Sequence, residues 1–359
     1  MLLTTFITAK IILKFLILPM NNQFETILLG HGSGGKLSHD LITELFAAHF
    51  DNDILRQQSD SAIIETTGTQ LAFTTDSFVV DPIFFPGGDI GKLAIAGTVN
   101  DLAVSGATPK YISVGFIIEE GLALKELERI VTSMAEEAKK AGVKIVTGDT
   151  KVVDRGKCDK VFINSSGIGI LDKKNVHISS GSQIKAGDKI IINGSIGDHG
   201  MAVMAARNDL NITADTKSDC ACLNELIKSA MAVSDQIKFM RDATRGGLGT
   251  VIAELAREKD FGIHLQEAQL YVNEGVRGMC ELLGFDPIYV ANEGKVVMVV
   301  AAEHAHGVLD AIQKHKTGKN AAIIGEITSD HAGKAWLETQ VGGKRIIDML
   351  SGQQLPRIC

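Results

Sequence analysis

The sequence predicts an α/β protein, because strand-like and helix-like segments alternate from about residue 71 onward. Residues 70–81 are β-branched and aromatic, which is typical of a strand, and residues 88–107 are small and helical, with Asp89 as a candidate N-cap. Residues 121–142 are the clearest helix, since their apolar side chains recur every three to four positions until Gly142.

The remaining elements follow the same alternation. Strands are predicted over residues 110–120, 143–153 and 160–171, and a polar turn over 183–188 is a candidate domain boundary. Beyond it we expect a strand, glycine turn and helix over 189–207, a helix with a glycine-rich entrance over 241–260, and two strands over 287–301 around an Asn-Glu-Gly turn. The last nine residues have no periodicity.

Length and composition limit the function classes. At roughly 150 residues per domain, 359 residues suggest two domains, each with its own core. A net charge of −7 and an aromatic content of 5% argue against a nucleic-acid partner. Five cysteines are an odd number in a long chain, which excludes a disulfide framework and favours a reducing, cytoplasmic location.

The first 19 residues are apolar but are interrupted by Lys10 and Lys14. A signal peptide places its charge before an unbroken apolar region, and a membrane helix needs about 20 apolar residues with few charges. We therefore expect no membrane anchor, and interpret this stretch as an upstream start or a peripheral or disordered extension, with Met20 opening a normal cytosolic sequence.

A glycine-rich loop and several aspartates indicate a nucleotide and metal site. The loop over residues 31–36 precedes a helical pattern, and glycines let backbone N–H groups approach phosphates, although a plain flexible turn has the same composition. Asp76, Asp101 and Asp149, with Asp60 as a less certain fourth, carry the oxygen ligands that Mg²⁺ prefers. Each alone is equally explained as a cap or turn residue; together with the loop they favour a magnesium–nucleotide site.

Longer motifs carry a resemblance to a known family. The segments "HGSGGK", "LAFTTDSFVVDPIFFPGGDIGKLAIAGTVNDLAVSGATPKY", "SMAEEAKKAGVKIVTGDTKVV", "GDHG", "RDATRGGL", "ANEGK" and the terminal "PRIC" resemble those of the HypE family of hydrogenase maturation proteins, which are carbamoyl dehydratases. The likeness runs from about Met20 to Cys359. The wider superfamily contains aminoimidazole ribonucleotide synthetase and selenophosphate synthetase, and the first 19 residues depart from the family pattern.

This resemblance implies the two-domain α/β fold of the aminoimidazole ribonucleotide synthetases, with the N-terminal sheets of two chains pairing in a homodimer. We expect an extension over residues 1–19 that is not part of the fold and an ATP-binding and dimerisation domain over 20–180. A C-terminal α/β domain would follow over 181–345, and a flexible tail over 346–359 would end in the reactive cysteine.

The activity implied is the ATP-dependent dehydration of a carbamoyl group on the Cys359 thiol to a thiocyanate, whose cyanide goes to the iron of a nickel–iron hydrogenase. ATP and Mg²⁺ are the implied cofactors. The implied partners are a carbamoyltransferase that loads Cys359, an iron-binding maturation scaffold and its small chaperone. Phosphorylating the amide oxygen makes it a good leaving group, which accounts for carboxylates and a glycine loop that position phosphates.

The resemblance also implies roles for individual residues. Nucleotide binding is assigned to His31, Gly32, Ser33, Gly34, Gly35, Lys36, Asn100 and Arg245, and metal binding to Asp60, Asp76, Asp101 and Asp149. Glu293 is the expected general base; without the resemblance it would be interpreted as a solvated hairpin residue. Lys151 shares a strand face with Asp149 and either neutralises phosphate charge or helps to deprotonate the amide. Arg245 has a second interpretation as a simple partner of Asp242.

The terminal residue Cys359 has two interpretations of its own. A nine-residue tail reaches roughly 30 Å at about 3.3 Å per residue, and its polar and glycine residues allow it to swing into a site and out to a partner. The alternative is a frayed end with an incidental thiol. Two further functions stay open: another ATP-dependent enzyme of the superfamily, which would not need Cys359, and a non-enzymatic thiol or metal carrier, which would hydrolyse no ATP.

Overall fold

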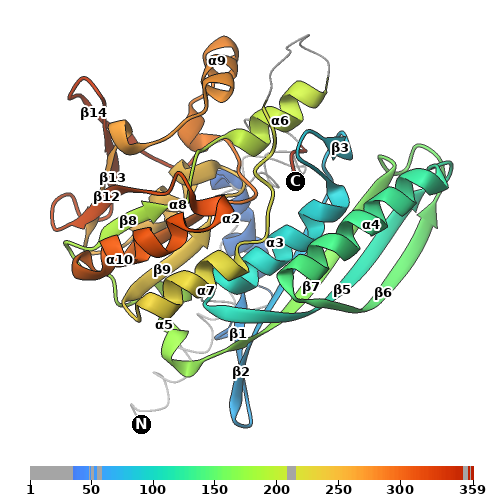
Figure 1. Ribbon diagram of the computed structural model, residues 1–359, viewed down its shortest axis with the longest axis horizontal. Coiled ribbons are helices and arrows are strands. Elements are labelled where there is room, and N and C mark those ends of the chain that lie inside the picture. The colour runs from blue at the N-terminus through green and yellow to red at the C-terminus, as the bar shows by residue number, and fades with distance from the viewer. Residues whose placement is uncertain are drawn as a thin grey trace, which may run out of the picture.

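The computed structural model describes residues 35–47, 49, 52–54, 59–207, 216–350, 355 and 357–359 (Figure 1). The predictions for residues 1–19 and for His31, Gly32, Ser33 and Gly34 lie outside these residues. Within the described part of the chain, no helix is both long enough and apolar enough to cross a membrane. The chain forms two main sheets that lie side by side in Figure 1, each with its own helices, which confirms the predicted α/β class.

The first sheet has five strands in the order β1-β2-β7-β5-β6, all neighbours being antiparallel except β5 and β6. Helices α3 and α4 cover one of its faces (Figure 1), and no helix of the described residues covers the other face. The elements of this half are α2 (Lys36–Leu41), η2 (Ile42–Ala47), β1 (Ala62–Thr66), β2 (Thr69–Phe78), β3 (Phe84–Phe85), β4 (Gly88–Asp89), α3 (Ile90–Val104), β5 (Ala107–Glu119), α4 (Leu124–Ala141), β6 (Lys144–Val153), β7 (Val161–Leu171), η4 (Lys173–Asn175) and α5 (His177–Ser180).

Helix α3 begins at the predicted cap and α4 ends at the predicted glycine, while α3 ends at Val104 and α4 begins at Leu124, each three residues inside the predicted range. The side chain of Asp89 caps α3 by accepting hydrogen bonds from the backbone N–H groups of Gly91 and Lys92. Gly142 ends α4 in the left-handed conformation, with φ of 70°, which glycine adopts without a Cβ clash. Nearly all of α3 is buried, so it forms the centre of the first half.

The second sheet has seven strands in the order β14-β13-β10-β12-β8-β11-β9. Helix α8 packs on one face, and α7 and α10 pack on the other, so that strand β11 is buried on both faces. The elements are β8 (Lys189–Ile192), α6 (Asp198–Ala206), α7 (Asn224–Val233), β9 (Ile237–Asp242), α8 (Gly247–Ala256), β10 (Gly262–Gln266), η5 (Glu267–Gln269), α9 (Glu274–Leu283), η6 (Pro287–Tyr289), β11 (Val296–Val300), α10 (Ala302–Gln313), η7 (Lys316–Gly318), β12 (Ala322–Thr328), β13 (Ala335–Glu338) and β14 (Lys344–Ile347).

The prediction of two strands over residues 287–301 is wrong. Pro287–Tyr289 is a 3-10 helix and only Val296–Val300 forms a strand. The intervening backbone bonds to other loops instead of to a neighbouring strand: the carbonyl of Ala291 accepts from the N–H of Gly200, and the N–H of Asn292 donates to the carbonyl of Ala243. The loop is therefore folded inward and is not an exposed hairpin turn.

Candidate active site

A cavity of about 270 Å³ lies where the two halves of the chain meet. We call it the acidic cavity, because five carboxyl groups reach it, together with Arg245 and Cys359. Its wall is formed by Asp60, Thr74, Thr75, Asp76, Ser77, Phe78, Gly97, Asp101, Asp242, Thr244, Arg245, Glu293 and Cys359. Six of the residues that the sequence singles out are thus brought to one place from distant parts of the chain: Asp60, Asp76, Asp101, Arg245, Glu293 and Cys359.

The aspartates of the cavity are crowded. Burial, followed by the charges of Asp76, Asp242 and Asp60, raises the pKa of Asp101 well above its usual value, although a 2.7 Å hydrogen bond from the Thr74 hydroxyl opposes the shift. Burial and the neighbouring carboxylates likewise raise the pKa of Asp242, and burial raises that of Asp76. Such a group of carboxylates is stabilised by a cation.

The donor set fits Mg²⁺ in one specific way. Among the described residues, no three His, Cys, Asp or Glu side chains are already arranged to hold a metal ion by themselves. Mg²⁺ usually takes only one or two protein carboxylates and completes its octahedron with water and substrate phosphates. Asp76, Asp101 and Asp242 are thus suited to share an ion that arrives with a nucleotide.

Asp242 is a cavity residue that the sequence analysis considered only as a partner for Arg245. It closes strand β9, immediately before the glycine-rich entrance to α8. That position, a carboxylate at a strand end followed by glycines, is the signal that could have identified it. Asp60 is held differently, because the Arg241 guanidinium pairs with it at 3.2 Å and with Glu254 at the same distance.

Glu293 is buried in the cavity wall, with only 3% of its surface exposed. Its Oε1 atom has no hydrogen-bond partner among the described residues. Burial, then the charges of Asp242 and Asp219, raise the pKa of Glu293 well above its usual value. The alternative interpretation of Glu293 as a solvated hairpin residue is therefore wrong, and burial makes its carboxylate a stronger base than that of an exposed glutamate.

Cys359 reaches the same cavity because the end of the chain is docked. Its terminal carboxylate accepts from the N–H of Val79 at 3.1 Å, Ile358 is buried, and Arg357 pairs with Asp159 at 2.7 Å. Burial raises the pKa of the Cys359 thiol to about 12, although the charge of Arg245 opposes the shift. In this docked position the sulfur is a neutral thiol; the swinging of the tail stays a prediction.

Asp149 and Lys151 lie elsewhere. Both are exposed on the edge strand β6, where they form a 2.6 Å ion pair with each other on one face, as their spacing predicts. Strands β5 and β7 separate β6 from β2, which carries Asp76. Within one chain, therefore, neither residue is brought to the acidic cavity.

Three described residues that the resemblance assigns to nucleotide binding do not line the acidic cavity: Gly35, Lys36 and Asn100. Asn100 is buried but does not line the cavity: its amide donates to the carbonyl of Ala221 at 3.1 Å and accepts from the N–H of Leu223 at 2.8 Å. Gly35 and Lys36 open α2, and the Lys36 N–H donates to the carbonyl of Leu350 at 2.8 Å. The geometry gives Asn100 a part in holding the two halves together.

Sequence models of the N- and C-terminal domains of AIR synthase related proteins match residues 58–171 and 185–338. Carbamoyl dehydratase HypE of Azotobacter vinelandii is 48% identical over 329 residues, covering 92% of this chain and 96% of that protein. The chain belongs to the HypE family of carbamoyl dehydratases. It covers nearly the full length of this relative.

Two solved structures of this family have the same fold. The structure of hydrogenase maturation protein HypE in complex with ATP superposes with a TM-score of 0.77, at 48% identity over 93% of this chain and 100% of that one. The HypE chain of a HypE–HypF complex superposes with a TM-score of 0.81, at 47% identity over 86% of this chain and 99% of that one.

Proposed function

We propose that this protein is an ATP-dependent carbamoyl dehydratase of hydrogenase maturation, which converts a carbamoyl group on Cys359 into a thiocyanate. The observation that carries the proposal is the docking of Cys359 into a cavity that also holds Glu293 and several aspartates. An incidental terminal thiol has no reason to occupy such a place. The same observation disfavours a superfamily enzyme that acts on a free small molecule, since the cavity is partly filled by the chain's own terminus.

The chemistry fits the groups present. The carbamoyl oxygen forms a bond to the γ-phosphorus of ATP and ADP leaves; the C–O bond then breaks with phosphate as the leaving group. The nitrogen loses both of its protons, so that a carbamoyl thioester and ATP give a thiocyanate, ADP and phosphate. Mg²⁺, when bound, neutralises the phosphate charge. Asp76, Asp101 and Asp242 would hold the ion, and Arg245 faces the reacting end of the tail.

Glu293 is the residue that takes protons from nitrogen. Its carboxyl group lines the same small cavity as the sulfur, and its Oε1 atom has no competing partner among the described residues. Once the thiol carries a neutral carbamoyl group, the tail enters this buried site with no charge on sulfur to desolvate. The base itself is thus buried away from bulk water.

Asp149 and Lys151 join the site from a second copy of the chain. The open face of the first sheet carries a row of exposed apolar side chains, with Ile168 paired on one side to Phe73 and on the other to Tyr111. A face of this kind needs a cover, and a second copy supplies it in a homodimer. Lys151 is in register with exposed Ile117 on the neighbouring strand, so pairing of the two faces places it in the interface between the copies.

Other parts of the proposal concern regions and partners. The glycine-rich stretch over residues 31–36 contributes to nucleotide binding, and the domains divide at residues 180 and 345. The carbamoyltransferase that loads Cys359 is a HypF protein, by analogy with the solved HypE–HypF complex. An iron-binding scaffold and its small chaperone receive the cyanide, and the cytoplasm is the compartment in which all of them meet.

Replacing Asp101 with asparagine should weaken Mg-ATP binding by about tenfold, because one ionic ligand is lost. The apo protein should melt at the same or a higher temperature, since the substitution relieves crowding and keeps an acceptor for the Thr74 hydroxyl. Titration calorimetry and thermal melts check both effects, with the exposed Asp330→Asn as control. Unchanged Mg-ATP affinity in Asp101→Asn would remove the metal role.

Mixing Lys151→Ala with Glu293→Gln, each inactive alone, should restore activity if Lys151 acts across the dimer. Random exchange gives heterodimers with one intact site of two, so about a quarter of the wild-type rate is expected. The rate of water loss from the carbamoylated protein is measured after the chains have exchanged. No recovery, in samples shown by native mass spectrometry to contain heterodimers, would place Lys151 outside the partner's site.

A further inference from the structure

Residues 218–221 form an extended stretch between α6 and α7, which we call the connector. It lies between the two halves of the chain and is held on both sides. The Ser218 N–H donates to the carbonyl of Pro86 at 2.8 Å, and the carbonyl of Ala221 accepts from the Asn100 amide at 3.1 Å. Gly294 lies so close that a Cβ there would meet the carbonyl oxygen of Asp219 at 2.1 Å. The connector is thus a fixed part of the domain junction.

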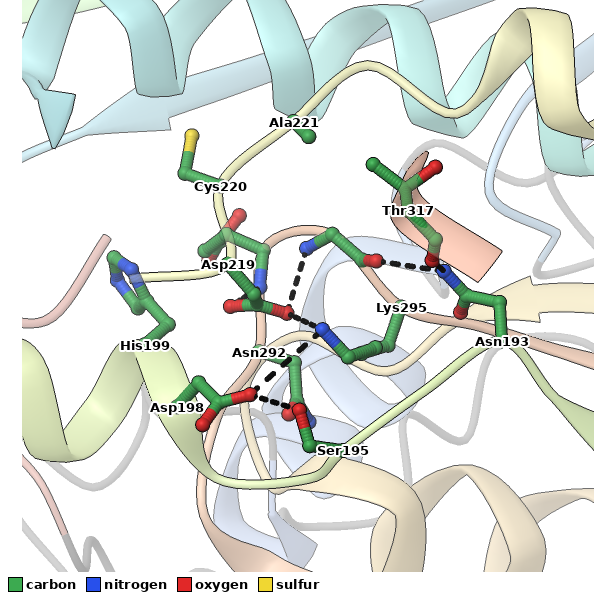
Figure 2. Close-up of polar contacts among 12 residues, drawn as sticks. Asn193, Ser195, Asp198, His199, Asp219, Cys220, Ala221, Asn292, Lys295 and Thr317 are labelled. Carbon is green, nitrogen blue, oxygen red and sulfur yellow. Dashed lines mark hydrogen bonds and ion pairs between the residues drawn. The ribbon is translucent and has the colours of Figure 1, made fainter. Parts of the chain in front are cut away.

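Asp219 of the connector holds the loop that carries Glu293. Its carboxylate accepts from the backbone N–H groups of Glu293 and Gly294, each at 3.1 Å, and from Lys295 Nζ at 2.8 Å. Figure 2 shows Lys295 lying between Asp219 and Asp198, whose nearest carboxylate oxygen is 3.9 Å away. Although burial opposes it, the charge of Lys295 holds the pKa of Asp219 below its usual value, so Asp219 is an ionised acceptor with three donors.

The backbone of Glu293 is therefore bound on both sides. Its N–H meets Asp219, and its carbonyl accepts from the N–H of Ala221 at 3.3 Å and lies 3.5 Å from the Asn100 amide. Its side chain alone, with Oε1 unpartnered among the described residues, is left for the cavity. A fixed backbone with an uncommitted carboxyl group is what a positioned base requires.

Ser218, the neighbour of Asp219, holds the docked terminus through His199. His199 is fully buried, and burial lowers its pKa, so it is neutral and has one ring N–H. Nε2 lies 2.6 Å from the carbonyl of Ile358, which can only accept, so Nε2 carries the proton. Nδ1 then accepts from the Ser218 hydroxyl at 2.8 Å. The carbonyl held in this way belongs to the peptide bond that joins Ile358 to Cys359.

We propose that the connector sets the position of Glu293 relative to Cys359, with Asp219 as the positioning residue for the base and His199, held by Ser218, as the positioning residue for the tail. This inference rests on the proposed function. Two adjacent connector residues, Ser218 and Asp219, hold the tail and the base, so one short segment of backbone fixes the positions of both reacting groups. A displacement of about 1 Å between base and substrate costs on the order of a hundredfold in rate, which gives such a support its value.

The main test compares Asp219→Asn with Asp198→Asn. Asparagine at 219 turns an NH₂ donor toward one of the three groups that donate to the Asp219 carboxylate, so at least one of these hydrogen bonds is lost. Asp198 is the matched control, because its side chain is equally buried and faces the same lysine but touches neither Glu293 nor the tail. We expect kcat for water loss from carbamoylated Cys359 to fall about 30- to 100-fold in Asp219→Asn. The ATP affinity of Asp219→Asn should stay within about threefold of wild type. In Asp198→Asn, both kcat for water loss and ATP affinity should stay within about threefold of wild type. Equal losses of kcat in the two variants, or an unchanged kcat in Asp219→Asn, would overturn the proposal.

A second measurement does not depend on catalysis, and it tests the tail half of the inference whether or not Asp219→Asn folds. The alkylation rate of Cys359 by iodoacetamide is followed by peptide mass spectrometry, with the Cys158 peptide as internal control. Ser218→Ala removes the donor to His199, so the terminus should open more often and its alkylation should quicken by about fivefold or more. An unchanged rate would refute the tail half of the inference, whereas failure of the wild-type protein to lose water would refute the proposed function instead.

Discussion

Replacing Cys359 with alanine should abolish carbamoyl loading and all product formation, because alanine has no sulfur to carry the group. ATP should still bind, since the aspartates and Arg245 are unchanged. Loading by the transferase is followed with labelled carbamoyl donor, and ATP affinity by calorimetry. The fold should be retained, because the docked terminus is also held by Ile358 and Arg357.

Cys158→Ala is the matched control for that experiment. Cys158 is a free cysteine in the turn between β6 and β7 and lies outside the acidic cavity. Its loss should leave loading and turnover at wild-type levels. Full turnover by Cys359→Ala would favour a superfamily enzyme that acts on a free substrate, and a wild-type protein that binds but never cleaves ATP would favour a carrier.

Glu293→Gln should lower the rate of water loss by roughly a hundredfold to ten-thousandfold, the range that a general base contributes. Glutamine keeps the shape of the side chain but cannot accept a proton. Loading of Cys359 should be normal and ATP binding should be retained, because neither depends on proton acceptance by this side chain. Single-turnover measurements on carbamoylated protein separate the chemical step from binding.

The matched control for Glu293→Gln is Glu254→Gln, a partly buried glutamate that pairs with Arg241 and does not line the cavity. It should retain the wild-type rate. Normal product formation by Glu293→Gln would transfer the role of base to another group, and Lys151 from the partner copy would be the next candidate.

The sequence predicts elements that depend on local chemistry. Asp89 caps α3 and Gly142 ends α4 through contacts with their own neighbours in the chain. The error over residues 287–301 has a non-local cause. Val290 has a strand-like side chain, but the backbone groups of Ala291 and Asn292 bond to Gly200 and Ala243, which are distant in sequence. No local pattern records such partners.

The candidate site likewise contains some residues that local sequence predicts and others whose position depends on long-range contacts. Asp76 and Asp101 lie at or near the ends of regular elements, which made them candidates, and the structure brings both to the cavity. The spacing of Asp149 and Lys151 predicts their shared face correctly. Their distance from the cavity, however, follows from the order of strands in the sheet, which long-range pairing decides. Asp219 has no motif around it, and its three donors belong to a loop more than 70 residues later.

The most direct test is the mass of the intact protein after loading by the carbamoyltransferase. Addition of Mg-ATP should lower the mass of the carbamoylated species by that of one water, and the change should map to the C-terminal peptide that contains Cys359. Glu293→Gln should load normally and keep its water over the same time. A carbamoyl group on a different residue, or a loaded Cys359 that never loses water with Mg-ATP present, would contradict the account.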